Sequence, residues 1–400
     1  MCDFGLGADL QLSPQLDEND TIGGNGMRNG TEERIDTLVI GGGQAGLAVG
    51  YHLSRAGVPH LIVDANERTG DAWRHRWDSL RLFTPNRFNS LPGLRIPGDD
   101  WGFPSKDELA DYLESYSAHF ELPIRHGTRI DRLTTDGDGF VASSGDLEIH
   151  ARSVVVAMAS YQRPKTPEFA AELDSGIVQL HAAEYRNPGQ LQEGDVLVVG
   201  LGNSGAEISM DLIPHHRVHL SGEPSAVQPF RPERLSGRIL MPIVGPLLLN
   251  GILNTGNPLG RKVRSKMFDK AAPLLRVKPK DLVSAGVERV SRVAGVIDGY
   301  PALDDGTILD VANVVWCTGF HPGFSWIDLP VFDDDGHVIH VRGVVDDVPG
   351  LYFVGLKFQY TMLSDTLSAA ERDSGYVVDR LVERRRNLQS SEASSPLAGR

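Results

Sequence analysis

Cysteine is almost absent from this chain of 400 residues, in which only Cys2 and Cys317 occur. Cys2 lies in a polar amino-terminal stretch and Cys317 in an apolar run, so the sequence offers no disulfide framework and no Cys-x-x-Cys redox pair. This cysteine usage is typical of a reducing compartment, and the cytoplasm is the predicted location.

Positive charge is also scarce, with 39 Lys and Arg against 53 Asp and Glu and a net charge of −14. A field of this sign repels phosphate, which argues against a general binder of nucleic acid or of anionic membranes. Long apolar runs are missing too: the nearest to the ~20 residues of a spanning helix is Ile239 to Leu253, which Pro242, Gly245 and Pro246 interrupt. No integral membrane segment and no metal site are predicted.

One stretch is basic, in contrast to the acidic chain as a whole. From Arg261 to Lys280, eight Lys or Arg stand against one Asp. A solvated helix face is the simpler interpretation. Together with the interrupted apolar stretch before it, the same residues could form a lid or a shallow membrane dock.

Glycine, by contrast, is abundant, and two groups of glycines follow apolar strands. Residues 35–64 read as a strand, a glycine turn, a helix and a second strand that ends at Asp64. Three glycines in G-x-G-x-x-G spacing form the turn: Gly41, Gly43 and Gly46. The pattern predicts a dinucleotide site in which helix amides face the pyrophosphate and Asp64 accepts hydrogen bonds from a ribose.

The residues after Asp64 hold too many charges, aromatics and prolines for a regular element, and we expect a loop that closes over the cofactor; a plain surface loop is the alternative. Ser105 to Phe120 has helical spacing, with Ser105 as N-cap and Glu108 completing a capping box. Residues 130–156 predict a β-meander that ends in a buried parallel strand.

A second turn of the same form follows the apolar strand 196–199, and it consists of Gly200, Gly202 and Gly205. The next strand ends in Ser221-Gly222-Glu223, with Arg231 and Arg234 beyond. Glu223 favours a ribose diol, whereas Ser221 and the two arginines favour the 2′-phosphate of NADPH. Two dinucleotide units in one chain fit an enzyme that passes a hydride from a diffusing nicotinamide to a bound flavin.

The sequence resembles the FAD- and NAD(P)H-dependent monooxygenases of the flavin-containing monooxygenase and YUCCA type, in a compact bacterial form, over residues 35–382. The segments that carry the resemblance are GGGQAG at 41–46, GDAWRHRWDSLRLFTP at 70–85, GLGNSGAEI at 200–208, CTGF at 317–320 and GLYFVGLKFQYT at 350–361. It implies an α/β fold of two Rossmann-like domains, with an NAD(P)H-binding domain (161–295) inserted into an FAD-binding domain that is split between 34–160 and 296–386. Residues 1–33 are expected to be a disordered acidic tail and 387–400 a flexible one.

The resemblance also implies the site residues. FAD is expected at Gly41, Gly43, Gln44, Ala45, Gly46, Asp64, Ala65, Trp73, Arg74, Leu82, Thr84 and Gln359, with Gly319 as a further cofactor contact. NADPH, with NADH as the alternative, is expected at Gly200, Gly202, Asn203, Ser204, Gly205, Ser221 and Arg231. The catalytic candidates are polar residues that the family places beside the flavin ring, Thr84, Asn86, Gln359 and Thr361, although a loop hydrogen bond is the alternative role for each.

Three positions depart from the family pattern. His181 and Tyr185 keep the spacing of a linker motif, but its upstream Phe is missing and Gly176 is one residue out, so His181 is either mechanistic or bonded to backbone. Met158-Ala159 replaces a Thr-Gly pair. Leu356-Lys357 stands where many flavoproteins have an Asp.

The expected reaction is oxidation of a small organic substrate by oxygen through a C4a-peroxyflavin, as the family implies. An NAD(P)H oxidase, a reductase with another acceptor, and a degenerate flavin-binding sensor or scaffold stay open. A disulfide reductase is disfavoured because Cys317 has no second cysteine beside it. The sequence allows a homodimer.

Overall fold

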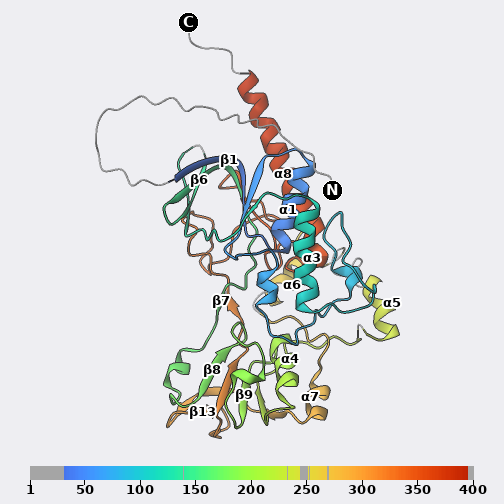
Figure 1. The fold of residues 1–400 in the computed structure, drawn as a ribbon, viewed down its shortest axis with the longest axis vertical. Helices are drawn as coiled ribbons and strands as arrows, with labels where there is room; N and C mark the ends of the chain where they lie inside the picture. Colours follow the sequence, from blue (N-terminus) through green and yellow to red (C-terminus); the bar gives the residue numbers. More distant parts are fainter. Residues whose placement is uncertain are drawn as a thin grey trace, which may run out of the picture.

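The computed structural model describes residues 31–137, 139–231, 233–243, 251, 253–267 and 270–394, which form two α/β units joined by two linkers (Figure 1). The helices are α1 (Gln44–Arg55), α2 (Asp71–Arg74), α3 (Lys106–His119), α4 (Asn203–Leu212), α5 (Leu235–Ile243), α6 (Pro258–Met267), α7 (Pro279–Ala285) and α8 (Leu367–Ser394), with 3-10 turns at Asn86–Phe88, Glu168–Glu172 and Pro188–Gln190. The strands are β1 (Thr31–Ile40), β2 (His60–Val63), β3 (Ile124–Arg125), β4 (Arg132–Thr135), β5 (Phe140–Ser144), β6 (Leu147–Val156), β7 (Arg163–Pro164), β8 (Val178–His181), β9 (Val196–Val199), β10 (Val218–Ser221), β11 (Glu288–Val290), β12 (Val293–Ile297), β13 (Tyr300–Leu303), β14 (Asn313–Trp316), β15 (Phe320–His321) and β16 (Leu351–Phe353).

The first sheet has the strand order β3-β2-β1-β6-β5-β4, and β16 pairs with the carboxyl half of β6. Strands β3, β2, β1, β6 and β16 are parallel, whereas β4 and β5 complete the predicted antiparallel meander with β6. The chain leaves β1 towards β2 and β3 and then crosses to β6 on the other side. Doubly wound sheets bind ligands at such a reversal, beyond the carboxyl ends of the strands.

Both faces of this sheet are buried, which explains its wholly apolar parallel strands. Val39 of β1 packs in one core with Leu47 of α1 and Val377 of α8, whereas Leu38 and Ile40 belong to a second core on the other face. Figure 1 shows α1, α3 and α8 grouped beside this sheet. Helix α3 has the predicted capping box, because Ser105 accepts from the Glu108 amide and Glu108 bonds back to the Ser105 amide.

The second sheet is fully parallel, with the order β11-β10-β9-β14-β8. Val196 and Val198 of β9 pack on the side of α4, and Leu197 and Val199 pack in a separate core on the opposite face. The hairpin β12–β13 contributes Val293 to that core. The two sheets are therefore separate, as expected from the sequence, and the core on the α4 side is continuous with the core beside α1 and α8.

The two linkers form a short antiparallel ribbon, β7 with β15, that lies between the two units in Figure 1. The first linker leaves the carboxyl end of β6, and the second leaves the carboxyl end of β14. Because β6 neighbours β1 and β14 neighbours β9, the glycine turns after β1 and β9 both open towards the junction between the units.

The sheet topology moves three predicted boundaries. Residues 31–33 extend β1 and pair with β6, where Glu33 forms an ion pair with Arg125 at 2.8 Å, so they are not part of a tail. Strand β14 belongs to the second sheet, so the chain returns to the first unit after the ribbon and not at residue 296. Helix α8 continues to Ser394, which makes residues 387–394 helical; the rest of both predicted tails lies outside the described residues. In the part of the chain that the structure describes, no helix has the length and apolar character needed to cross a bilayer.

Candidate functional site: two glycine turns at a domain junction

The two glycine turns have the same geometry. Their first glycines, Gly41 and Gly200, both have φ +109°, a conformation that favours glycine. A Cβ on Gly46 would lie 1.8 Å from the carbonyl oxygen of Gly41, and a Cβ on Gly205 would lie 1.9 Å from that of Gly200. Only glycine therefore allows each helix to begin so close to its strand.

The middle glycines, Gly43 and Gly202, are the N-caps of α1 and α4, and both have extended backbone. A Cβ on Gly43 would meet nothing within 4 Å, and one on Gly202 would meet only Ala271, at 3.8 Å. The fold itself does not require glycine at these two positions. A diphosphate that approaches the helix amides does require it, so both turns fit a dinucleotide.

Asp64 and Trp73 lie beside the first turn, as predicted. The Asp64 carboxylate accepts hydrogen bonds from the Gly42 amide at 2.5 Å and from the Asn66 amide at 2.7 Å. Trp73 donates from Nε1 to Oε1 of Gln44 at 3.3 Å, which places the predicted closing loop over the start of α1.

The carboxyl-terminal return of the chain also reaches this turn. A Cβ on Gly355, which follows β16, would lie 3.2 Å from the Cβ of Ala45. On another side, Gly41 packs against the backbone of Ala157 and Met158, the residues that replace the family's Thr-Gly pair. The first turn is thus enclosed by three segments that are distant in the sequence.

The guanidinium of Arg74 makes its hydrogen bonds within the protein. It donates to the Thr69 carbonyl at 2.7 Å, to Asp111 at 2.8 Å and to Glu114 at 2.6 Å, and so ties the closing loop to α3. Of the other residues expected at FAD, Leu82 is buried and Ala65 is exposed.

Thr84 and Asn86 make hydrogen bonds within their own loop. Thr84 donates to Asn89 at 2.5 Å, and the side-chain Nδ2 of Asn86 donates to the carbonyls of Pro97 and Asp99 at 3.2 and 2.9 Å. Oδ1 of Asn86 is buried without a hydrogen-bond partner among the described residues.

Gln359 and Thr361 are also engaged locally. Gln359 donates to the Arg342 carbonyl at 3.2 Å and accepts from the Leu356 amide at 3.3 Å, and Oγ1 of Thr361 accepts from the Leu363 amide at 3.2 Å. Both are buried in the loop that follows β16. Their hydrogen bonds fix the shape of this loop beside the first turn.

At the second turn, the side chain of Asn203 does not point to open space. It donates to the Pro273 carbonyl at 3.1 Å and accepts from the Leu275 amide at 3.2 Å, which ties residues 273–275 to the start of α4. Its neighbour Ser204 is half-buried.

Two residues expected to favour the 2′-phosphate of NADPH are bonded to other parts of the protein. The Ser221 hydroxyl donates to the Ser291 carbonyl at 2.9 Å and accepts from the Val293 amide at 3.1 Å, so it joins β10 to the following hairpin. Arg231 forms an ion pair with Asp281, in which Nη2 donates to both carboxylate oxygens at 2.7 and 2.8 Å. Both side chains therefore already have partners within the protein.

The structure places a different cation, Arg289 of β11, at the end of β10. Its guanidinium donates to the Gly222 carbonyl at 2.6 Å and to Glu223 at 3.0 Å. Gly222 adjoins the second turn, because a Cβ on it would lie 3.1 Å from the Leu201 amide nitrogen. Arg289 is 66 residues from Glu223, and only the parallel pairing of β10 with β11 brings them together.

Glu207, on α4, was also not predicted. Burial raises the pKa of its carboxyl to about 7, and the guanidinium of Arg276, 3.8 Å away, opposes this rise. Arg276 in turn donates to the Arg81 carbonyl at 3.1 Å, across the junction. Glu207, whose side chain is 14% exposed, is therefore an acid with a raised pKa beside a contact between the two units.

His181 is bonded to backbone, in line with one of its two predicted roles. Its Nδ1 accepts from the Ala183 amide at 3.1 Å, so Nε2 carries the proton that is donated to the Gly319 carbonyl at 3.0 Å. Burial lowers the pKa of His181, which keeps the ring neutral. Gly319, with φ +88°, thus lies in the linker beside His181.

Burial raises the pKa of the Cys317 thiol to about 12. A thiol of this pKa stays protonated at neutral pH, and only the thiolate attacks a disulfide.

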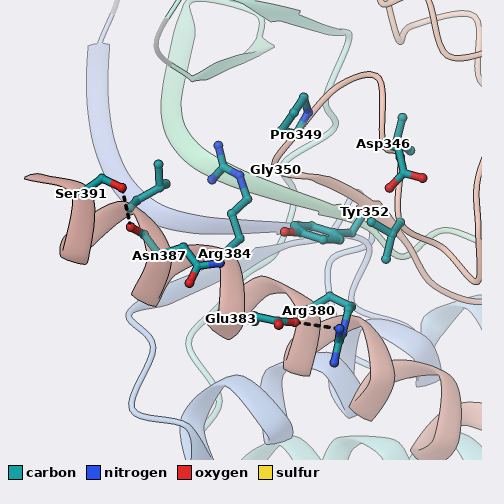
Figure 2. A pocket seen from close by; sticks show the side chains of 12 residues that line it. Asp346, Pro349, Gly350, Tyr352, Arg380, Glu383, Arg384, Asn387 and Ser391 are labelled. Atoms are coloured by element: carbon teal, nitrogen blue, oxygen red, sulfur yellow. Dashed lines mark hydrogen bonds and ion pairs between the residues drawn. The ribbon is translucent and has the colours of Figure 1, made fainter.

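Two other features lie apart from the turns. A cavity of about 370 Å³ opens between α8 and the residues before β16, at the amino end of that strand, where Figure 2 shows Arg380, Arg384 and Tyr352 along its wall. Among the described residues, Asp333, Asp335 and His337 bring potential metal ligands within 4.8 Å of one another, but the Asp333 carboxylate already accepts from the amides of the other two.

The fold and the paired turns define a class: two-domain oxidoreductases that bind two dinucleotides. A family model described as pyridine nucleotide-disulphide oxidoreductase matches residues 38–245. An uncharacterized CzcO-like oxidoreductase of Geobacillus kaustophilus is 40% identical over 87% of this chain and 98% of its own length. Indole-3-pyruvate monooxygenase YUCCA1 of Oryza sativa subsp. japonica is 28% identical over 81% of this chain and 88% of its own.

Among solved structures, a flavin-containing monooxygenase from Stenotrophomonas maltophilia matches with a TM-score of 0.72 and 27% identity, over 88% of this chain and 99% of that one. The chain belongs to the pyridine nucleotide-disulphide oxidoreductase family and, within it, to the flavoprotein monooxygenases of the flavin-containing monooxygenase and YUCCA type. It is an enzyme, and the predicted fold class and family are confirmed. FAD and NADP(H) are cofactors at the level of the family, and a structural neighbour is a complex with both.

Proposed function

We propose that this enzyme holds FAD at the first glycine turn, takes NADPH at the second, and uses oxygen to oxidise a small organic substrate. The observation that supports this most is the pair of middle glycines, Gly43 and Gly202, which the fold does not need and a diphosphate does. Both turns open towards the same junction, as transfer between two cofactors requires.

In this proposal the protein residues bind the cofactors, orient them and enclose them. The amides at the start of α1 bind the FAD diphosphate, Asp64 accepts from its ribose, and Trp73 covers it. Gln359 and Thr361 shape the wall of the flavin pocket through their fixed loop, and Asn86 offers its unpaired Oδ1. The bound flavin supplies the acceptor for hydride and the reaction with oxygen.

A preference for NADPH over NADH is supported by Arg289. Its guanidinium lies at the end of β10, next to the second turn, where the ribose 2′-position of a bound dinucleotide falls in this fold. Glu223, 87% exposed, is free to turn away from a phosphate that Arg289 binds. This replaces Ser221 and Arg231 as the basis of the preference.

Anaerobic reduction by NADPH, followed by rapid mixing with oxygenated buffer, tests the proposal. We expect the yellow protein to be bleached by NADPH under nitrogen, and a transient absorbing species to persist after oxygen is added until substrate is supplied. Peroxide released one-for-one with NADPH, with or without substrate, would instead identify an oxidase. A yellow protein that NADPH does not bleach would identify a flavin-binding sensor.

A further inference from the structure

Helix α5 presents a row of large aliphatic side chains to solvent. Leu235 is 73% exposed, Ile239 56%, Ile243 50% and Leu240 39%. At 3.6 residues per turn these four lie on one side of the helix, while Gly237, on the other side, is buried. Isolated exposed aliphatic residues are ordinary, but four of the fourteen exposed large hydrophobic side chains in the described residues lie on this one helix.

Cations and a tryptophan border the row. The guanidinium of Arg238 lies 5.6 Å from the ring centroid of Trp101, and that of Arg87 lies 4.8 Å from the same centroid. Trp101 is partly exposed, and Arg234, at the start of the helix, is exposed with no ion pair among the described residues. We call these residues together the α5 surface: Leu235, Ile239, Leu240, Ile243, Arg234, Arg238, Arg87 and Trp101.

The α5 surface belongs to the basic part of an acidic chain. Residues 231–280 contain eleven Lys or Arg and two acidic residues, a net charge of +9, whereas the whole chain carries −14 and the remainder therefore −23. At physiological salt, charges more than about 8–10 Å apart are largely screened. An approaching surface therefore meets the charges that lie at α5 itself, among them Arg87 and Arg238 beside Trp101, rather than the net charge of the chain.

We propose that the α5 surface docks on an anionic lipid bilayer, with α5 lying in the plane of the interface. An in-plane helix buries its aliphatic row at the boundary of the acyl chains, while its arginines extend to the headgroup phosphates. A tryptophan at the edge of the row is typical of the headgroup layer. Nucleic acid would account for the cations but not for the aliphatic row.

Docking of this kind brings the domain junction to the membrane. Arg238 contacts Trp101, and Arg276, in the same basic segment, donates across the junction to the Arg81 carbonyl, 3.1 Å away. The segment after α5 also pairs with the loop beside the first turn, through the Thr255 amide and the Tyr360 carbonyl at 2.8 Å. A bilayer at the α5 surface is therefore next to the residues that enclose the candidate site.

Vesicle flotation with the full-length protein tests the proposal. Vesicles of phosphatidylcholine with phosphatidylglycerol are compared with vesicles of phosphatidylcholine alone, at low and at high salt. We expect the protein to float with the anionic vesicles at low salt and to be released at high salt. The double variant Ile239→Gln and Ile243→Gln removes two aliphatic anchors and should weaken binding about tenfold or more.

A matched control is the double variant Ile297→Gln and Ile339→Gln, because both of these isoleucines are 48% exposed elsewhere on the protein. It should bind vesicles like the unaltered protein. Equal binding by both double variants, or no binding to anionic vesicles, would overturn the proposal. So would a dimer, measured by sedimentation without vesicles, that the α5 variant dissociates, because a second copy would then be the occupant.

Discussion

The substitution Gly202→Val tests cofactor binding at the second turn without disturbing the fold. Gly202 has φ −93° and ψ −170°, which valine adopts readily, and a Cβ there would meet only Ala271, at 3.8 Å. We therefore expect the thermal unfolding midpoint to change little, as for an exposed substitution of about 0.5 kcal/mol. FAD bound at the first turn should be unaffected.

The effect on reduction by NADPH should be large. A valine side chain occupies the space through which the diphosphate reaches the amides of α4. Loss of two charge-assisted hydrogen bonds, each worth about 1.5–3 kcal/mol, corresponds to roughly 10²–10⁴ in kcat/KM. Anaerobic stopped-flow measurement of flavin bleaching, as a function of NADPH concentration, gives this ratio directly.

Gly43→Val is the matched variant at the first turn, where a Cβ meets nothing within 4 Å. It should fold but be purified without flavin, whereas Gly202→Val should be purified yellow and be reduced normally by dithionite. If Gly202→Val were bleached by NADPH at the rate of the unaltered protein, the second turn would not be the nicotinamide site.

Three further predictions follow from residues around the second turn. Arg289→Gln should lower kcat/KM for NADPH about 10–100-fold and leave kcat/KM for NADH nearly unchanged. The control is Arg217→Gln, which removes a 65% exposed partner of Glu288. An equal loss for both reductants would refute the role of Arg289. Burial raises the pKa of Glu207 to about 7, so between pH 4.5 and pH 7 the native state keeps a proton that the unfolded state releases. The free energy of unfolding should therefore fall by up to about 3 kcal/mol over this range. Glu207→Gln should remove this dependence of the free energy of unfolding on pH, and an unchanged dependence would refute the raised pKa. Cys317→Ala should keep NADPH-dependent flavin reduction, since a thiol with a pKa of about 12 stays protonated at neutral pH, and a loss of turnover would reopen a thiol mechanism.

The sequence predicted the parts of the site that depend on local backbone. Each glycine turn follows its own strand directly, so spacing alone located Gly41 to Gly46 and Gly200 to Gly205, and a local capping box located the start of α3. The sequence did not predict where the chain returns to the first unit, because the apolar residues of β14 fit either sheet equally well. Only pairing with β8 and β9 decides this.

The sequence does not show which distant partners the polar side chains near the second turn bond to. Ser221 and Arg231 follow the relevant strand in the sequence, but one is bonded to Ser291 and the other to Asp281. Arg289, which does lie at the strand end, belongs to a strand that follows a long insertion. The proximity of a residue to a motif in the sequence is therefore a weak guide when a parallel neighbour supplies the charge.

The loop between Trp73 and Arg81 serves both units. At one end Trp73 bonds to Gln44 beside the first turn. Further along, the Asp78 amide donates to the Arg186 carbonyl of the second unit at 2.7 Å, and the Arg81 carbonyl accepts from Arg276 at 3.1 Å. Hydride transfer requires reacting atoms about 3–3.5 Å apart, and a misplacement of about 1 Å is costly. The segment that lies over the first glycine turn therefore also bonds to the second unit, so in the proposed function one loop would both enclose the FAD and set the approach of the nicotinamide.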